Sequence, residues 1–286
     1  MPELPEVETM RRGVQGVVEH TIRRVRRTPC RLKPIQIQPR IDALDRRVAG
    51  RKITAVGRRG KRLLLHLDDA SAIVIEPRMT GLILVADPPN EQHLRVRIEL
   101  EGPRHEDLLF WDRRGLGTFR WLPAETLARL LDQSTLGVDA LEVTAAQLQA
   151  TLAASRRAVK VALLDQRAVA GIGNLYAAEI LHVAGVDPRT RCDSLSGPQW
   201  QRIAAATRQV LGEAIRYEGS TLSDGTYRNA LNSAGGYQNH HRVYDREGQP
   251  CRRCGHESIR RIVQAQRATF FCGHCQQRRG KHRSVP

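Results

Sequence analysis

Four of the six cysteines stand in two Cys-x-x-Cys pairs near the end of the chain, at Cys251 and Cys254 and at Cys272 and Cys275. Seventeen residues separate the two pairs, and this spacing is typical of a zinc ribbon in which each pair comes from one tight turn. Disulfides are the alternative, and a reducing cytoplasm disfavours them. Because four cysteines fill a tetrahedral site completely, we expect one zinc ion with a structural role.

The chain is strongly basic, with 46 Lys and Arg against 30 Asp and Glu and a net charge of +16. Residues 241–286 alone hold 11 basic and 3 acidic residues. A charge of this sign and size predicts a polyanionic partner, and we expect nucleic acid. Aromatic residues make up only 4% of the chain, too few for a single-strand binder built on stacking platforms. Contacts with backbone phosphates, with a few inserted side chains, are therefore expected.

The chain is long enough, at 286 residues, for two domains with separate cores. No apolar run approaches the length of a membrane span, and the first residues lack the layout of a secretory signal. We therefore expect a cytoplasmic protein that has no membrane partner.

The hydrophobic period changes halfway along the chain. An apolar repeat at residues 7–17 predicts a helix, and the runs that follow are short, β-rich and punctuated by Gly, Pro, Asp and Asn. Such runs, with no helix between them, indicate an antiparallel sandwich. The β-rich runs are 53–56, 63–67, 72–75, 82–85, 94–100 and 108–111, and helices are expected at 124–131, 145–154, 159–165, 174–183 and 197–217. A linker around 133–139 and a long loop at 218–243 complete the expected organisation.

The chain begins Met-Pro-Glu-Leu-Pro-Glu, so removal of Met1 would leave Pro2 with a free secondary amine. An α-amino group titrates near about pH 8, and a secondary amine that attacks an aldehyde-like carbon forms an iminium ion. Glu3 and Glu6 would then stand beside it as carboxylates that move protons. The alternative is that Pro2 and Pro5 only shape an extended entry to the first helix.

Several loops carry residues suited to DNA. The glycine-containing turn before Asn174 offers N–H groups at a helix start, and Lys61 lies in a basic turn before a β-rich run. Met79 lies in a short loop and is a candidate wedge for a base stack. Arg114 and Leu116 alternate along another turn, where Arg114 suits a base without its partner. These signals are individually weak, because glycine turns, solvated basic turns and buried methionines are common.

Blocks along nearly the whole sequence resemble those of bacterial formamidopyrimidine-DNA glycosylases. The matching segments are MPELPEVET, RRGKRLLLHL, RMTG, DRRGLGT, VAGIGNLYAAEILHVAGV, GSTLSD, RVYDREGQPC and the ribbon that ends RATFFCGHC. The resemblance implies an α+β multidomain fold. It consists of an N-terminal antiparallel β-sandwich flanked by helices, a C-terminal helix–two-turn–helix domain and a zinc-finger β-hairpin. The implied boundaries are 1–132 for the catalytic domain, 133–143 for a linker, 144–243 for the helical domain with its lesion-recognition loop, and 244–280 for the four-cysteine zinc finger.

The resemblance also implies a role for individual residues. Pro2 is similar to the family's nucleophile and Schiff-base former, Glu3 to its general acid and base, and Glu6 to a supporting carboxylate. The residues that match its phosphate contacts are Lys61, Asn174 and Arg267, and those that match the side chains filling the gap left by the extruded base are Met79, Arg114 and Leu116. His93 matches a DNA-contacting histidine.

Two positions depart from the family pattern. Leu116 stands where phenylalanine is common, and Arg113-Arg114-Gly115 replaces the usual Pro-Arg-Arg. Leu can enter a base stack but stacks poorly, so the search for lesions is expected to differ. Residues 225–239, which correspond to the loop over the damaged base, also differ, which leaves the lesion preference less defined than the chemistry.

The implied activity is excision of oxidised purines, chiefly 8-oxoguanine and formamidopyrimidines, from duplex DNA, followed by nicking of the abasic site. A monomer without an obligate protein partner is expected. Two alternatives stay open. One is an endonuclease VIII type of glycosylase for oxidised pyrimidines, although its members usually have Gly at the position of Leu4. The other is a zinc-ribbon protein that binds DNA without catalysis, which would not need Pro2 and Glu3.

Overall fold

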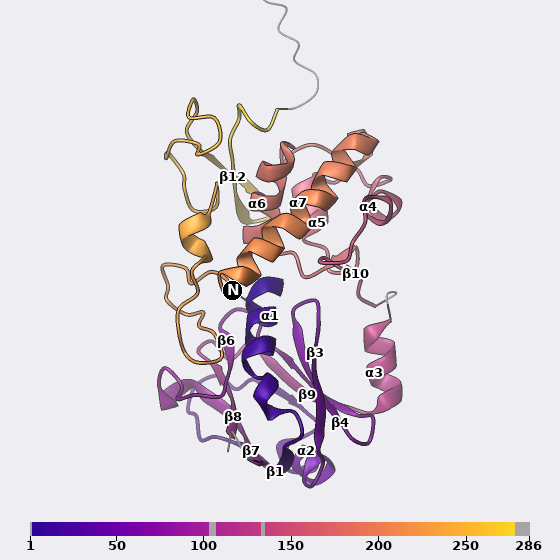
Figure 1. The fold of residues 1–286 in the computed structure, drawn as a ribbon, viewed down its shortest axis with the longest axis vertical. Coiled ribbons are helices and arrows are strands. Elements are labelled where there is room, and N and C mark those ends of the chain that lie inside the picture. Colours follow the sequence, from indigo (N-terminus) through magenta and orange to yellow (C-terminus); the bar gives the residue numbers. More distant parts are fainter. Residues whose placement is uncertain (1, 103–106, 133–134, 278–286) are drawn as a thin grey trace, which may run out of the picture. The chain divides into compact units, whose positions relative to one another are not determined.

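The computed structural model describes residues 2–102, 107–132 and 135–277 (Figure 1). The chain folds into two compact units, which we describe separately. The first unit consists of Met1–Thr135 with Ala214–Gln238, and the second of Leu136–Glu213 with Asn239–Pro286. Met1, residues 133–134 of the expected linker and residues 278–280 of the expected finger lie outside the described residues.

Two β-sheets form the first unit. Across the four-stranded sheet the order is β1 (Thr21–Arg27), β7 (Leu94–Glu101), β8 (Asp107–Asp112) and β6 (Gly81–Leu84). Across the five-stranded sheet it is β2 (Gln36–Gln38), β9 (Thr118–Leu122), β5 (Ala72–Glu76), β4 (Arg62–Leu67) and β3 (Ile53–Arg59). All neighbouring strands pair antiparallel except β2 and β9, which run parallel. The predicted antiparallel sandwich is confirmed.

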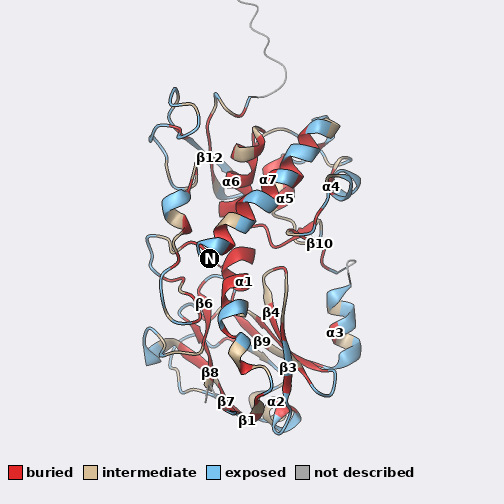
Figure 2. Cartoon of the chain, in the orientation of Figure 1, coloured by how far each residue is buried: buried red, intermediate tan, exposed pale blue. Residues whose placement is uncertain are grey.

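Alternation along β4 shows how the core of this unit forms. Leu63 and Leu65 join the main core, which both sheets and helix α1 (Leu4–Gly13) supply, whereas Leu64 points to a smaller cluster with Leu127 of α3 (Ala124–Leu131). Successive side chains of a strand face opposite sides, so one leucine-rich strand serves two cores. Figure 2 shows the result, with buried strands and an α3 that is largely exposed.

The sequence analysis did not predict three strands of the first unit, β1, β2 and β9, or its helix α2. Helix α2 (Ile41–Val48) interrupts the region expected to contain only strands, and it buries Leu44 and Val48 alone. Strand β1 has four arginines among its seven residues and buries only two side chains. With so few buried apolar residues, the hydrophobic periodicity is too weak to identify these elements from the sequence. The predicted helix at 7–17 also ends early, at Gly13, and a 3-10 turn (Gln15–Val17) follows.

Most of the 218–243 loop belongs to the first unit, although the sequence analysis assigned it to the helical domain. The physical reason is its packing. Tyr227 and Ala230 of the loop are buried in the main core of the first unit, and the backbone N–H of Val85 donates to the carbonyl of Ala230. The remaining domain boundaries stay a prediction.

The second unit is helical and ends in a β-hairpin. Its helices are α4 (Ala145–Leu152), α5 (Val159–Leu163), α6 (Asn174–Ala184) and α7 (Gly197–Arg216), whose last turn passes into the first unit. Strands β12 (Arg260–Gln264) and β13 (Arg267–Phe271) form the hairpin, and β13 packs against α6. Part of the expected linker is ordered, since β10 (Val138–Asp139) pairs in parallel with β11 (Val169–Ala170). Among the described residues, no helix has the length and apolar character needed to cross a membrane.

Candidate active site and zinc centre

The first residues of the chain form a buried cluster of carboxylates at the start of α1. Pro2, Glu3 and Glu6 are all buried, and Glu3 is the N-cap residue of the helix. One carboxylate oxygen of Glu6 accepts the backbone N–H of Glu3 at 2.9 Å, and the other accepts the N–H of Ser220 at 2.9 Å. Glu6 therefore joins the start of the helix to residues 218–238, the part of the 218–243 loop in the first unit, and each of its two carboxylate oxygens accepts a hydrogen bond from a different segment.

Gly219, directly before Ser220, allows this approach. Its φ is +78°, and a Cβ on it would lie 2.9 Å from Cγ and Oε1 of Glu6. The ring of Tyr227 is also close, since its Cε1 would lie 3.1 Å from the same Cβ, and its hydroxyl donates to the carbonyl of Glu218 at 3.0 Å. Burial, together with the charge of Glu6, raises the pKa of Tyr227 well above its usual value, so its hydroxyl stays protonated.

Lys61 lies in the two-residue turn between β3 and β4, where Gly60 has a φ of +56°. Arg58, at the end of β3, donates to the carbonyl of Gly60 at 2.9 Å and to the Glu8 carboxylate of α1 at 3.1 Å. The turn that carries Lys61 is thus tied to the helix that carries Glu3 and Glu6.

Glu8 is the centre of this link. Burial alone would raise its pKa, but hydrogen bonds from Arg11 and Arg12 and the charges of Arg11 and Arg58 lower it to about 2. The carboxylate is therefore ionised at neutral pH and accepts from all three arginines. The sequence analysis did not identify Glu8 or Arg58, because the residues that they join are far apart in the chain.

The three predicted gap-filling residues occupy two loops of the first unit. Met79 lies between β5 and β6 and is 37% exposed. Arg114, which is exposed, and Leu116, which is half-buried, lie between β8 and β9. The fully buried carboxylate of Asp112 accepts from both loops, through the Thr80 hydroxyl and the N–H of Leu116. The structure therefore brings these two loops together.

His93 ends a 3-10 turn (Glu91–His93) before β7, and its ring packs edge-on against Trp111 with centroids 5.3 Å apart. Its Nδ1 atom is buried without a hydrogen-bond partner among the described residues. Burial, reinforced by the nearby charges of Arg95 and Arg113, lowers the pKa of His93 below its usual value. The ring is therefore neutral at physiological pH.

Asn174 and Arg267 come together in the second unit. Asn174 starts α6, directly after Gly173, and donates its side-chain amide to the carbonyl of Ala268 at 3.0 Å. Lys160 of α5 is fully buried and donates to the Asn174 side-chain oxygen and to the same carbonyl. Arg267 is exposed at the start of β13 and makes no ion pair or side-chain hydrogen bond with any described residue. Sequence reasoning missed Lys160, whose only signal was a lysine within an apolar helix.

Glu179 of α6 holds the segment that leads into the zinc finger. It is completely buried, and its carboxylate accepts the backbone N–H groups of Arg242, Val243 and Tyr244 at 2.8–3.1 Å. Burial raises the pKa of Glu179, although these donors oppose the effect. No sequence signal indicated this role.

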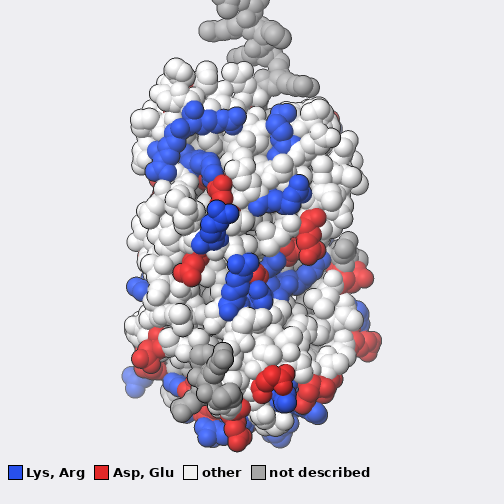
Figure 3. Space-filling view, viewed as in Figure 1, with Lys and Arg blue, Asp and Glu red and all other residues white. Residues whose placement is uncertain are grey.

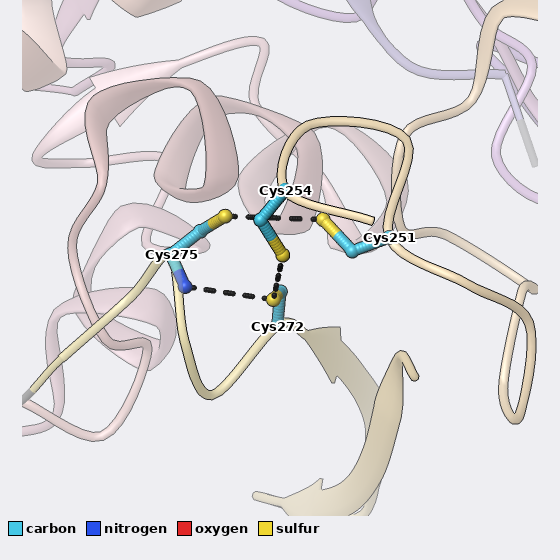
Figure 4. A group of neighbouring side chains, drawn as sticks. All are labelled: Cys251, Cys254, Cys272 and Cys275. Carbon is cyan, nitrogen blue, oxygen red and sulfur yellow. Dashed lines mark hydrogen bonds between the residues drawn. The ribbon is translucent and has the colours of Figure 1, made fainter. Parts of the chain in front are cut away.

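The four predicted zinc ligands meet at one point (Figure 4). The Sγ atoms of Cys251, Cys254, Cys272 and Cys275 all lie within 4.8 Å of one another. The Cys251–Cys275 and Cys254–Cys272 sulfur separations are 3.9 and 3.7 Å. A tetrahedral site with Zn–S bonds of about 2.3 Å requires sulfurs about 3.8 Å apart. The donor set and its spacing fit one structural zinc ion.

Among the charged side chains on the face of the second unit drawn in Figure 3, most are basic and few are acidic. Arg252 and Arg253, between two zinc ligands, are both exposed. A surface of this charge attracts a polyanion, and the attraction falls with ionic strength.

Family models and known relatives match almost the whole chain. Residues 1–119 match the formamidopyrimidine-DNA glycosylase N-terminal domain, 136–226 the formamidopyrimidine-DNA glycosylase H2TH domain, and 248–278 a zinc finger found in FPG and IleRS. Formamidopyrimidine-DNA glycosylases of Chloroflexus aurantiacus and Bacillus subtilis are each 39% identical over 96% of this chain and 98% and 99% of their own length.

Solved structures agree with these matches. MutM (Fpg) of Thermus thermophilus has a TM-score of 0.83 at 37% identity, with 96% of this chain and 98% of that chain covered. Wild-type Lactococcus lactis Fpg in complex with DNA that contains N7-benzyl-Fapy-dG has a TM-score of 0.85 at 30% identity, with 97% and 100% covered. The chain belongs to the formamidopyrimidine-DNA glycosylase family.

Proposed function

We propose that this protein is a bifunctional DNA glycosylase of base excision repair. It extrudes an oxidised purine, 8-oxoguanine or a formamidopyrimidine, from duplex DNA, removes the base and nicks the strand at the abasic site. Extrusion costs a few kcal/mol, and least for a damaged base. The described residues that would contact the DNA are those predicted, namely Lys61, Met79, His93, Arg114, Leu116, Asn174 and Arg267.

Pro2 is the proposed nucleophile. With Met1 removed, its nitrogen lone pair attacks C1′ of the extruded nucleotide, and the glycosidic bond breaks as the base leaves. The C1′–O4′ bond then opens, Glu3 donates the proton that O4′ takes up, and the nitrogen lone pair forms an iminium with C1′. The iminium makes the C2′ proton acidic, and its loss expels the 3′ phosphate. A second elimination expels the 5′ phosphate, and water hydrolyses the remaining iminium, which frees Pro2 and the sugar fragment and leaves a gap of one nucleotide.

The observation that carries this proposal is the buried pair of carboxylates beside residue 2. Burying a carboxylate is costly unless it is hydrogen-bonded, and Glu6 meets this condition by accepting N–H groups from Glu3 and Ser220. Part of this arrangement is helix capping, since Glu3 and Glu6 form a capping box. The bond from Ser220 lies outside that box and holds the Glu6 carboxylate from a second segment. Two buried glutamates close to an N-terminal proline also suit proton transfer at a reacting sugar.

Lys61, Asn174 and Arg267 are proposed to hold the phosphates around the extruded nucleotide. Zinc bound by the four cysteines holds the hairpin that presents Arg267 and takes no part in the chemistry, because the cysteines leave no open position for substrate.

Borohydride trapping tests the chemistry. The full chain with a C-terminal tag should give a covalent adduct with a duplex that carries 8-oxoguanine opposite cytosine. The same tag at the N-terminus blocks the amine and should abolish the adduct. An undiminished adduct with a blocked N-terminus would refute Pro2 as the nucleophile, and mass spectrometry of each preparation verifies its N-terminus.

A Glu3→Gln variant separates base removal from strand cleavage. Loss of general acid catalysis should slow excision of 8-oxoguanine by about 10²–10⁴-fold, whereas an adduct with a preformed abasic site should persist. Glu125→Gln is the matched control, since Glu125 is 85% exposed on α3. Equal activity of both variants on 8-oxoguanine would remove Glu3 from the mechanism.

The two alternatives have their own outcomes. Preferred excision of thymine glycol over 8-oxoguanine would place the enzyme with the endonuclease VIII type. Damage-specific binding without an adduct would leave a DNA-binding protein without catalysis. The monomeric state and the cytoplasmic, nucleoid-associated location are parts of the same proposal.

A further inference from the structure

Asp112 ends β8 directly before the turn that carries Arg114 and Leu116. Its side chain is fully buried, and its carboxylate accepts several hydrogen bonds. Oδ2 accepts the N–H groups of Leu116 and Gly117, each at 2.8 Å, and Oδ1 accepts the N–H of Arg114 at 3.2 Å. One side chain therefore fixes the backbone of the whole turn.

Thr80 connects this turn to the loop of Met79. Its hydroxyl donates to Oδ1 of Asp112 and accepts the N–H of Arg114 at 3.0 Å. Across the sheet, Asp112 pairs with Gly81, the residue that follows Thr80. The hydroxyl is thus a bridge that donates to the end of β8 and accepts from the turn beyond it, and it is itself buried.

The loops need such support because their backbones are unusual. Arg78, next to Met79, has a φ of +56°, which a residue with a Cβ rarely adopts. Gly115, between Arg114 and Leu116, has a φ of +62°, and a Cβ on it would lie 2.1 Å from the carbonyl oxygen of Lys33. Conformations of this kind persist where surrounding contacts determine them.

We propose that Asp112 and Thr80 are positioning residues that lock the Met79 loop and the Arg114–Leu116 turn into one rigid wedge. The three side chains then enter the duplex together, at the place that the extruded nucleotide leaves. This inference rests on the proposed function for its DNA substrate, but the bridge itself consists of contacts within the first unit.

Two substitutions of Thr80 separate the hydrogen bonds from the packing. Thr80→Val keeps the shape of the side chain but can neither donate to Asp112 nor accept from Arg114. Thr80→Ser keeps the hydroxyl. Thr118→Val is the matched control, because Thr118 is buried in the same sandwich and its hydroxyl has no hydrogen-bond partner among the described residues.

The experiment uses the full chain and a duplex with a tetrahydrofuran abasic analogue opposite 2-aminopurine, whose fluorescence reports its stacking. A second titration measures binding to the same duplex without damage. For wild type, Thr80→Ser and Thr118→Val, we expect a fluorescence change and a clear preference for the damaged duplex. For Thr80→Val, we expect that preference to fall by about fivefold or more, the effect of a buried polar group that loses its partner. Binding to undamaged DNA should stay within about twofold, because it depends on phosphate contacts.

The outcomes distinguish this inference from the proposed function. If Thr80→Val keeps the wild-type preference, or if wild type shows no fluorescence change, the wedge is refuted even when the borohydride adduct forms. If Thr80→Val lowers the binding of damaged and undamaged DNA equally, its effect is a general loss of structure, which also contradicts the proposal. If the preference falls as expected but no adduct forms with wild type, the wedge stands and the chemistry of Pro2 is wrong.

Discussion

Gly219 offers a direct test of how firmly Glu6 is held. An alanine there meets two obstacles. Its φ of +78° lies in the left-handed region, which costs a residue with a Cβ about 1–2 kcal/mol. The new Cβ would also lie 2.9 Å from Cγ and Oε1 of Glu6, so the carboxylate must move. Its hydrogen bonds to the N–H groups of Glu3 and Ser220 oppose that movement.

Gly50→Ala separates these two costs. Gly50 belongs to the same unit and has a φ of +79°, but a Cβ on it meets nothing within 4 Å. Both variants therefore lose about 1–2 kcal/mol from the backbone. Gly219→Ala should lose about 2 kcal/mol more, because a hydrogen bond to a charged group is worth about 1.5–3 kcal/mol. For a unit of this size, that difference lowers the melting temperature by about 4–8 °C beyond the fall in Gly50→Ala.

The rate of adduct formation on an 8-oxoguanine duplex is the second readout. Displacement of catalytic groups by about 1 Å can cost about 10²-fold, so Gly219→Ala should be at least tenfold slower than Gly50→Ala at a temperature where both are folded. Equal melting temperatures and equal rates for the two variants would refute the described packing of Glu6. A lower melting temperature with an unchanged rate would leave Glu6 as a purely structural residue.

Three further perturbations have defined outcomes. The pKa of Glu8 is lowered to about 2, so the stabilisation from its ion pairs is fully present above pH 4.5 and is lost as the pH falls towards 2. Glu8→Gln should therefore lower the free energy of unfolding in urea melts by about 2–3 kcal/mol at pH 7 and by much less at pH 3. Arg267→Ala should leave the melting temperature unchanged. It should reduce the slope of the logarithm of the duplex binding constant against the logarithm of the salt concentration by about 1. Arg129→Ala, on the exposed helix α3, is the control and should leave that slope unchanged. Ala265 and Gln266 form the β12–β13 turn with φ of +45° and +60°, so replacing them with Asn and Gly should raise the melting temperature of the zinc-loaded protein, and a lower one would contradict the turn geometry.

Local signals in the sequence were sufficient for some elements. Cysteine spacing alone locates the zinc site, because each pair needs only a tight turn and thiolates bind zinc wherever four can meet. Periodicity located strands with several buried aliphatic residues, such as β4, but not β1, whose seven residues include four arginines. Local patterns also did not indicate that residues 218–238 pack with the first unit, since the burial of Tyr227 is decided by residues far away in the chain.

Motifs were sufficient to propose the site residues, whereas they gave no indication of the groups that hold those residues in place. Lys160 contacts a carbonyl 108 residues away, and Ser220 donates to a carboxylate 214 residues away. No periodicity or propensity encodes a pairing over such a distance. The resemblance to a family implied roles for Asn174 and Glu6, but it did not indicate which residues form hydrogen bonds with their side chains.

Buried charged groups mark these long-range links. Glu8, Asp112, Lys160 and Glu179 are all buried, and each binds to a segment outside its own helix or strand. Burying a charge is expensive, and a well-packed apolar residue often stabilises a fold as well or better. Each of the four groups fixes a loop, turn or strand that presents a proposed DNA contact or leads into the zinc hairpin. The geometry of these segments therefore depends on the hydrogen-bond partners of the four charges, which an apolar residue of the same size could not provide.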